Sequence, residues 1–175
     1  MESKNSNLSP FDRNMSVDVS NIDMSYITSH GGPLNIPVAF KKLANFHSLP
    51  RYATNGAAAM DICSAVDAYV KKDIVEKIAT GIAVQIPGGY EIQVRSRSGL
   101  ASKGVIVVNA PGTIDSDYTG EIFILLASIT GGCQIKKGDR IAQLVLAPVT
   151  RIDLVEVDTF TETERGDGGF GSTGL

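Results

Sequence analysis

The chain has 175 residues, a length typical of one domain that can bury a core without disulfide support. Its composition is that of a globular protein, and its 18 glycines and 7 prolines favour short strands joined by turns. The net charge of −3 argues against broad nucleic-acid binding, which needs a basic face. Neither a membrane-spanning apolar run nor a signal-peptide core occurs, so we expect a cytoplasmic protein that binds no membrane.

The cysteines and histidines give no sign of a metal centre. Cys63 and Cys133 lie far apart in the sequence and form no CxxC pair. A disulfide between them stays open, but a cytosolic location favours reduced thiols. His30 and His47 have no Cys or Glu at ligand spacing, which argues against a zinc site.

Composition divides the chain into three parts. Residues 1–34 are rich in Ser, Asn and Asp and lack sustained periodicity, so we expect a disordered N-terminal arm. This arm is either dispensable or a partner-binding segment. We expect a β domain over 35–160 and a flexible, Gly-rich C-terminal tail over 161–175.

Short β-strands are expected from the start of the domain. A proline inside Ile36–Phe40 marks that segment as an edge strand, because proline cannot donate to a sheet. Met60–Val66 reads as a second strand. Apolar residues alternate over 82–86 and again over 90–95, and the Pro87-Gly-Gly turn between them predicts a β-hairpin.

The later strands are more apolar. Val105–Val108, Ile122–Ile129 and Ile141–Val149 are nearly continuous apolar runs, which indicates burial on both faces, in a sandwich or at a subunit interface. Ile152–Val157 is expected to form a further strand. About eight short strands with frequent turns favour an all-β, jelly-roll-like sandwich or distorted barrel.

The segment around Arg97-Ser98-Gly99 suits phosphate. A strand ends there, and Ser98 is expected to cap a short helical turn that Gly104 closes. A helix N-terminus presents unpaired N–H groups to an anion, and Arg97 adds a permanently charged planar fork. The alternative is a plain capped turn with solvated arginines.

The segment Asn109–Glu121 carries two carboxylates, Asp115 and Asp117, and the ring of Tyr118 just beyond a Pro-Gly turn. Carboxylates two positions apart on an extended chain point the same way, and one of them can take a proton from water. The amide of Asn109 offers the donor and acceptor that a pyrimidine edge requires. A turn decorated with aspartates is the alternative.

Two further features suit a nucleotide. Gln143 is the polar side chain of an apolar strand, where it makes either a structural hydrogen bond or a ligand contact. The tail offers Arg165 for a phosphate, Phe170 for stacking, and hydroxyl and amide groups over 171–173, so it can close over a nucleotide as a lid.

The order of these segments resembles the five motifs of trimeric dUTP pyrophosphatases (dUTPases), over about residues 36–175. The segments are Ala57–Ala65, the Arg97-Ser-Gly-Leu turn, Gly112–Glu121, Gly138–Gln143 and the Gly-Phe-Gly-Ser-Thr-Gly tail. The resemblance implies a homotrimer of jelly-roll-like subunits with active sites between them, each closed by the flexible C-terminal arm of one chain. It also implies Mg²⁺-dependent hydrolysis of dUTP to dUMP and pyrophosphate, which keeps uracil out of DNA and supplies dUMP for dTMP synthesis.

Residue roles follow from the same resemblance. Asp115 is implied to activate the attacking water, and Tyr118 to pack on the deoxyribose and exclude a 2′-hydroxyl. Mg²⁺ is implied to be held mainly by the phosphates, with Asp61 supporting its water shell. The remaining implied contacts are Asn109, Thr113 and Ile114 for uracil, Arg97, Ser98, Gly99 and Gln143 for phosphate, and Arg165, Phe170, Gly171, Ser172 and Thr173 for the lid.

The chain departs from that family at Ala59, where glycine is usual, and at Gly104, where many members have histidine. A dCTP deaminase on the same fold is one alternative, although such enzymes carry a different sequence in place of Asp-Ser-Asp-Tyr. A non-catalytic nucleotide sensor is another, although the aspartate and the tail that it would lose are both present.

Overall fold

The structure is a computed structural model that describes residues 35–169. The expected N-terminal arm and the lid residues Phe170, Gly171, Ser172 and Thr173 lie outside the described residues. The elements are β1 (Ala39–Lys42), β2 (Arg51–Tyr52), β3 (Met60–Cys63), β4 (Ala68–Val70), β5 (Glu76–Gln85), β6 (Tyr90–Arg95), α2 (Ser98–Ala101), β7 (Val105–Val107), β8 (Gly112–Ile114), β9 (Glu121–Ser128), β10 (Cys133–Ile135) and β11 (Arg140–Pro148).

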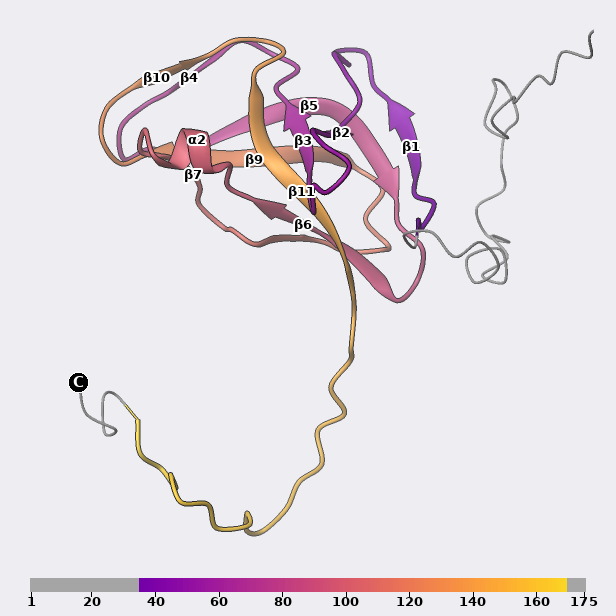
Figure 1. Ribbon diagram of the computed structural model, residues 1–175, viewed down its shortest axis with the longest axis vertical. Coiled ribbons are helices and arrows are strands. Elements are labelled where there is room, and N and C mark those ends of the chain that lie inside the picture. Colours follow the sequence, from indigo (N-terminus) through magenta and orange to yellow (C-terminus); the bar gives the residue numbers. More distant parts are fainter. Residues whose placement is uncertain (1–34, 170–175) are drawn as a thin grey trace, which may run out of the picture.

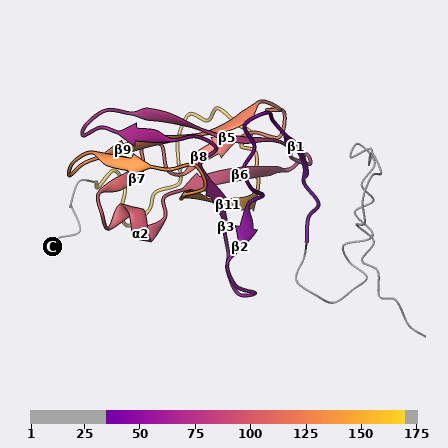
Figure 2. The same cartoon turned by 90° about the horizontal axis from the view of Figure 1, so that it is seen from above.

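Two antiparallel sheets pack face to face. One has the order β1-β5-β9-β7 and the other β2-β3-β11-β6-β8, and the β4–β10 pair extends the body at one end (Figures 1 and 2). The core between the sheets is made of branched aliphatic side chains that both layers supply, among them Ile62, Ile82, Ile122, Ile124, Leu126, Ile141 and Leu144. The prediction of an all-β, jelly-roll-like sandwich is confirmed.

Strand β1 pairs with β5 alone, so the predicted edge strand is confirmed, although pairing begins at Ala39, after the proline. The partner strand bends at Gly81, where φ is +71° and the register with β9 shifts. A Cβ atom at Gly81 would lie 2.6 Å from the Cα of Phe46. Glycine therefore lets the segment after β1 pack directly on the sheet.

The predicted hairpin between 82–86 and 90–95 is wrong. β5 pairs with β1 and β9, whereas β6 pairs with β11 and β8, so Pro87-Gly-Gly carries the chain from one sheet to the other. Within that turn, the Tyr90 N–H donates to the carbonyl oxygen of Pro87 at 3.3 Å. Alternating apolar residues and a tight turn arise equally when two strands face the core from opposite layers.

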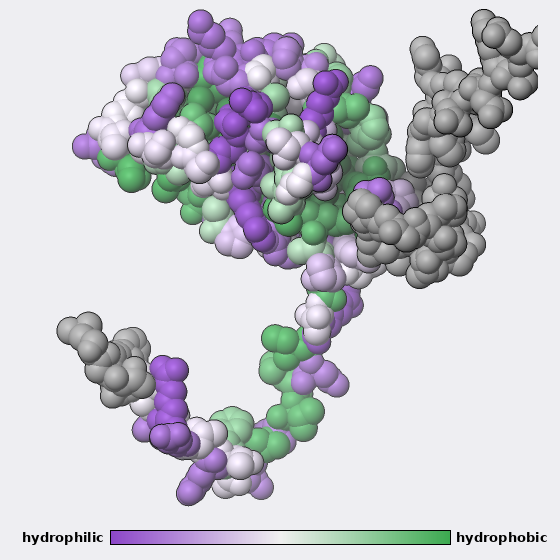
Figure 3. Space-filling model, in the orientation of Figure 1, coloured by the Kyte–Doolittle hydropathy of each residue, from purple (hydrophilic) through white to green (hydrophobic). Residues whose placement is uncertain are grey.

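The predicted strand Ile152–Val157 is also wrong. In the described part of the chain, β11 is the last regular element, and residues 149–169 then leave the body as an extended segment (Figure 1). Ile152 is 84% exposed and Leu154 90% exposed, and apolar residues stand out along this segment in Figure 3. An apolar alternating segment needs a neighbouring strand and an apolar surface, and residues 35–169 of one copy supply neither.

Among residues 35–169, no helix combines the length and hydropathy that crossing a bilayer would require. Cys63 and Cys133 are both partly buried free thiols.

Candidate active site

An ion-pair cluster on the outer face of the five-stranded sheet joins three of the candidate segments. Asp61 is only 9% exposed, yet it points away from the core because its neighbour Ile62 fills that side of β3. Its Oδ1 accepts a hydrogen bond from Arg97 Nε at 2.8 Å, and its Oδ2 accepts one from Arg140 Nη1 at 3.0 Å. Gln143 Nε2 also donates to Oδ1, at 3.4 Å. One carboxylate thus holds two guanidinium groups and an amide side by side.

Strand pairing assembles this cluster. In the sheet register, Gln143 on β11 lies between Asp61 on β3 and Arg95 on β6. A register shift between Arg140 and Ala142 places Arg140 beside the same carboxylate. The structure therefore brings together Asp61 with the predicted phosphate contacts at 97 and 143. It adds Arg140, to which the sequence interpretation gave no role.

The phosphate turn begins α2. Arg97 is its N-cap residue, with extended backbone and no side-chain cap, so the prediction that Ser98 caps the helix is wrong. Ser98 and Gly99 are instead the exposed first residues of the helix, where N–H groups have no partner within a helix. Gly104 ends the turn with φ of +84°, and a side chain there would collide with Thr130, so its closing role is confirmed.

Asp115 lies in a tight turn directly after β8 and is exposed. The Tyr118 N–H donates to the carbonyl oxygen of Asp115 at 3.1 Å and closes this turn. Asp115 and Asp117 therefore do not sit on an extended strand, and the expectation that they point the same way on one is wrong. The Tyr118 hydroxyl donates to the carbonyl oxygen of Glu121 at 2.8 Å, and a Cβ atom at Gly120 would lie 2.6 Å from that hydroxyl. The ring is held close against a glycine.

The predicted uracil contacts cluster at β8. Asn109 and Thr113 are exposed, whereas the side chain of Ile114 is buried in the core. A Cβ atom at Gly112 would lie 2.8 Å from Asn109 Nδ2. Glycine at 112 therefore makes room for the Asn109 amide to lie across the start of β8, beside backbone groups of the strand.

The ion-pair cluster and the Asp115 turn lie at opposite ends of the β6–β8 pair. Ile114 pairs with Ile92, so Asp115 follows at the beginning of β6, whereas Arg97 lies beyond its end. The strand length between these positions is about 20 Å, at about 3.3 Å per residue. Within one chain, Asp115 and Arg97 do not face one catalytic space.

Of the predicted lid residues, the structure describes Arg165, and of the predicted metal contacts it describes Asp61. Arg165 is exposed, and its Nε donates to the carbonyl oxygen of Gly168 at 2.8 Å. Across residues 35–169, no three His, Cys, Asp or Glu side chains gather as a metal cage. A carboxylate offers about four lone-pair sites, so the three contacts of Asp61 leave about one site for a further hydrogen-bond donor.

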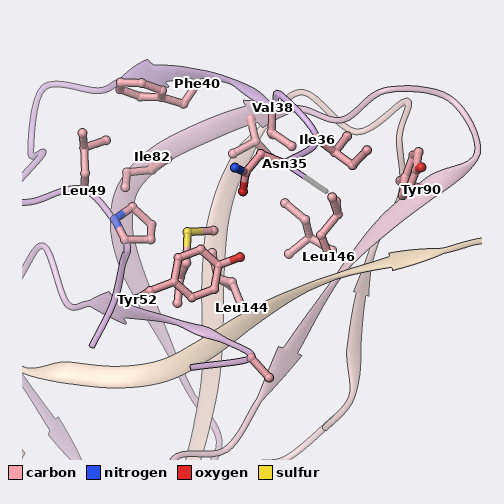
Figure 4. A pocket seen from close by; sticks show the side chains of 15 residues that line it. Asn35, Ile36, Val38, Phe40, Leu49, Tyr52, Ile82, Tyr90, Leu144 and Leu146 are labelled. Atoms are coloured by element: carbon pink, nitrogen blue, oxygen red, sulfur yellow. The ribbon is translucent and has the colours of Figure 1, made fainter. Parts of the chain in front are cut away.

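A separate hollow of about 550 Å³ opens between the sheets near β1 and β2 (Figure 4). Phe40, Leu49, Tyr52 and Leu146 are among the side chains that converge on it, and its described lining includes no charged residue. A polyanionic nucleotide would lose its hydration there without compensation. The outer-face cluster is the better phosphate site.

The chain resembles known proteins over most of its length. The dUTPase family profile matches residues 46–174. A relative from Zymomonas mobilis, named deoxyuridine 5′-triphosphate nucleotidohydrolase, is 51% identical over 81% of this chain and 100% of its own length. A relative of the same name from Chlamydia trachomatis is 51% identical over 77% of this chain and 97% of its own.

Solved structures agree. The dUTPase of Staphylococcus bacteriophage 80alpha, solved with dUpNHpp, superposes with a TM-score of 0.73 at 30% identity, over 81% of this chain and 100% of that one. A mutant dUTPase from phage phi11 of Staphylococcus aureus, described with a structural Mg(II) ion, gives a TM-score of 0.66 at 27% identity, over 71% of this chain and 99% of that one.

The all-β fold and these relatives define a nucleotide hydrolase. The chain belongs to the dUTPase family. It is a dUTP diphosphatase and hydrolyses dUTP to dUMP. This assignment replaces the alternatives of a deaminase and of a non-catalytic nucleotide sensor.

Proposed function

We propose that the chain hydrolyses dUTP in sites that are shared between the subunits of a homotrimer. The separation of Asp115 from Arg97 along the β6–β8 pair carries this proposal. A site that uses both residues takes Asp115 from one copy and the ion-pair cluster from another. A head-to-tail contact between three copies repeats that site three times.

The exposed apolar surface supports association. Ile152 and Leu154 are almost fully exposed in one copy, although their pattern is that of a half-buried strand. On β9, Phe123 and Leu125 are only partly buried, on the face opposite the core-facing Ile124. Contact with neighbouring copies would cover both surfaces, as the continuous apolar runs in the sequence predict.

Asp115 acts on the water. Its exposed carboxylate takes a proton as the water oxygen attacks the α-phosphorus of dUTP. The bond from that phosphorus to the bridging oxygen of the β-phosphate breaks, so dUMP and pyrophosphate leave. The backbone contact from the Tyr118 N–H fixes the turn, which aims the carboxylate without burying it.

Selectivity comes from the same segment. The ring of Tyr118, held by its hydroxyl contact to the Glu121 backbone, packs on the deoxyribose and leaves no space for a 2′-hydroxyl. The Asn109 amide and the backbone of Thr113 and Ile114 read the uracil edge, as a pyrimidine with both donors and acceptors requires.

The triphosphate lies on the cluster side of the site. Arg97, Ser98, Gly99 and Gln143 contact phosphate oxygens, and the lid of Arg165, Phe170, Gly171, Ser172 and Thr173 closes over the nucleotide. Mg²⁺ neutralises phosphate charge when bound, and it would be held mainly by the phosphates because it keeps several waters. Asp61 would accept a hydrogen bond from one of those waters.

Mixed trimers test the shared site. Chains with Asp115→Asn and chains with Arg97→Gln are each expected to be inactive alone. Random mixing in unfolding and refolding is expected to restore about a quarter of wild-type dUTP hydrolysis, because a head-to-tail site then sometimes receives both intact residues. Refolded wild-type chains give the reference. Mixtures that stay inactive, at wild-type levels of trimer, would show that one copy supplies both residues.

A cytoplasmic location is part of the proposal. The free thiols Cys63 and Cys133 suit a reducing compartment. Fractionation of the source cells tests it.

A further inference from the structure

We propose that Arg140 is a second triphosphate-binding arginine, and that Asp61 is the positioning residue that holds Arg140 and Arg97 side by side. The proposal rests on the phosphate role of Arg97 given above. It adds Arg140 as a substrate contact. It also gives Asp61 a positioning role in addition to its proposed contact with the water shell of the metal.

The hydrogen bonds leave both arginines with donors for a ligand. Arg97 uses Nε on Asp61 and Nη1 on the carbonyl oxygen of Arg140, at 2.9 Å. Arg140 uses only Nη1, on Asp61. Within residues 35–169, Nη2 of Arg97 and both Nε and Nη2 of Arg140 make no further hydrogen bond. Planar groups with such donors bind phosphate oxygens through two parallel bonds.

Charge supports the same conclusion. Two guanidinium groups share one carboxylate, so the cluster keeps one net positive charge. The side chain of Asp61 is 10% exposed, that of Arg97 21% and that of Arg140 57%. The carboxylate is thus the buried anchor, and Arg140 is the member whose head group reaches solvent. A polyanion that bound here would supply the missing negative charge.

The anchor also sets the direction of each group. Oδ1 takes Arg97 and Oδ2 takes Arg140, so one rigid carboxylate fixes both guanidinium groups relative to each other. Long arginine side chains otherwise lose rotamer freedom when they bind a ligand. Ordering them in advance lowers that cost, which is the effect expected of a positioning residue.

A purely structural ion pair is the competing explanation. The same contacts tie β3 to the start of β11 and to the residue before α2. Such a clamp would affect folding but not discriminate between ligands with and without phosphate. Ligand comparison in the full-length protein therefore separates the two explanations.

The test measures binding of an α,β-imido analogue of dUTP and of deoxyuridine, which has no phosphate. In Arg140→Gln, affinity for the analogue should fall about 10- to 100-fold, because a hydrogen bond to a charged group is lost. Affinity for deoxyuridine should not change. Arg140→Lys, which keeps the charge but not the fork, should recover part of the loss. Arg95→Gln, on the same sheet face but without contact to Asp61, is the matched control.

Asp61→Asn tests the positioning role. It should weaken analogue binding both with and without Mg²⁺, and the double variant with Arg140→Gln should lose less than the product of the two single effects. A loss in Asp61→Asn that disappears without Mg²⁺ would assign Asp61 to the metal alone and overturn the positioning role.

Two outcomes separate this proposal from the site described above. An Arg140→Gln variant that binds the analogue normally, or loses deoxyuridine equally, overturns the role of Arg140, provided that Arg97→Gln weakens the analogue. If Arg97→Gln also binds the analogue normally, the phosphate site itself has been misplaced.

Discussion

The two ends of the β6–β8 pair hold their functional groups in different ways. At one end, Asp61, Arg97 and Arg140 are joined by side-chain hydrogen bonds between two strands and a turn. At the other end, Asp115 is exposed, and among the described residues its side chain makes no hydrogen bond, so the backbone of its turn fixes it. In the proposed function, the first arrangement prepares charge for a polyanion, and the second presents a reactive group to a site that another copy completes. The two ends should therefore respond differently to mutation.

Asp115→Asn should give the largest effect on activity. The variant keeps the shape of the side chain but cannot take a proton, so kcat should fall about 10²- to 10⁴-fold. Because Asp115 is exposed, the melting temperature should stay that of the wild type. Steady-state dUTP hydrolysis and thermal unfolding provide the two readouts.

Asp117→Asn is the matched control, since it changes the same charge two positions away in the same turn. It should hydrolyse dUTP at nearly the wild-type rate. Equal losses in both variants would mean that the charge of the turn matters, and not one base.

Asp61→Asn, unlike Asp115→Asn, should lower the stability of the protein. Its buried carboxylate satisfies two cationic groups, so the variant should lose about 1–3 kcal/mol of unfolding free energy. Denaturant unfolding of Asp61→Asn beside Asp115→Asn measures the contrast. Equal stability of the two variants would contradict the view that side-chain contacts hold Asp61 but not Asp115.

Gly112→Ala tests how the Asp115 end reads the base. The added methyl group would lie 2.8 Å from Asn109 Nδ2, so the amide must move. We expect KM for dUTP to rise about 10-fold, since small displacements of a positioning group are costly. Gly88→Ala is the control, because a Cβ atom there meets nothing within 4 Å and should leave KM unchanged.

The sequence allowed good predictions where burial dominates. The apolar runs that became β9 and β11, and the edge strand after Pro37, were visible because sheets with buried faces impose simple patterns. The motif order indicated the family and the activity. The assigned roles of Asp115, Tyr118 and the lid remain predictions.

Pairing between distant strands was not visible. Asp61 and Arg140 are 79 positions apart, and a register shift in β11 brings Arg140 to the carboxylate. Alternation also did not show that Pro87-Gly-Gly crosses between sheets, or that 152–157 finds no partner strand among the described residues of one copy. Each of these features depends on which strands pair with one another. A local sequence pattern carries no information about that pairing.

Tyr118→Phe should have the smallest effect on activity, and it tests whether a side-chain hydrogen bond also matters at the Asp115 end. It keeps the ring but removes the hydrogen bond from the hydroxyl to the Glu121 backbone, which is worth about 0.5–1.5 kcal/mol. The ring should then tilt, so the preference for dUTP over UTP in kcat/KM should fall by a few-fold while kcat for dUTP changes little. Competition assays with both nucleotides measure the ratio. An unchanged preference would mean that packing against Gly120 alone positions the ring. The hydrogen bond from the Tyr118 hydroxyl would then contribute nothing to the selection of deoxyribose.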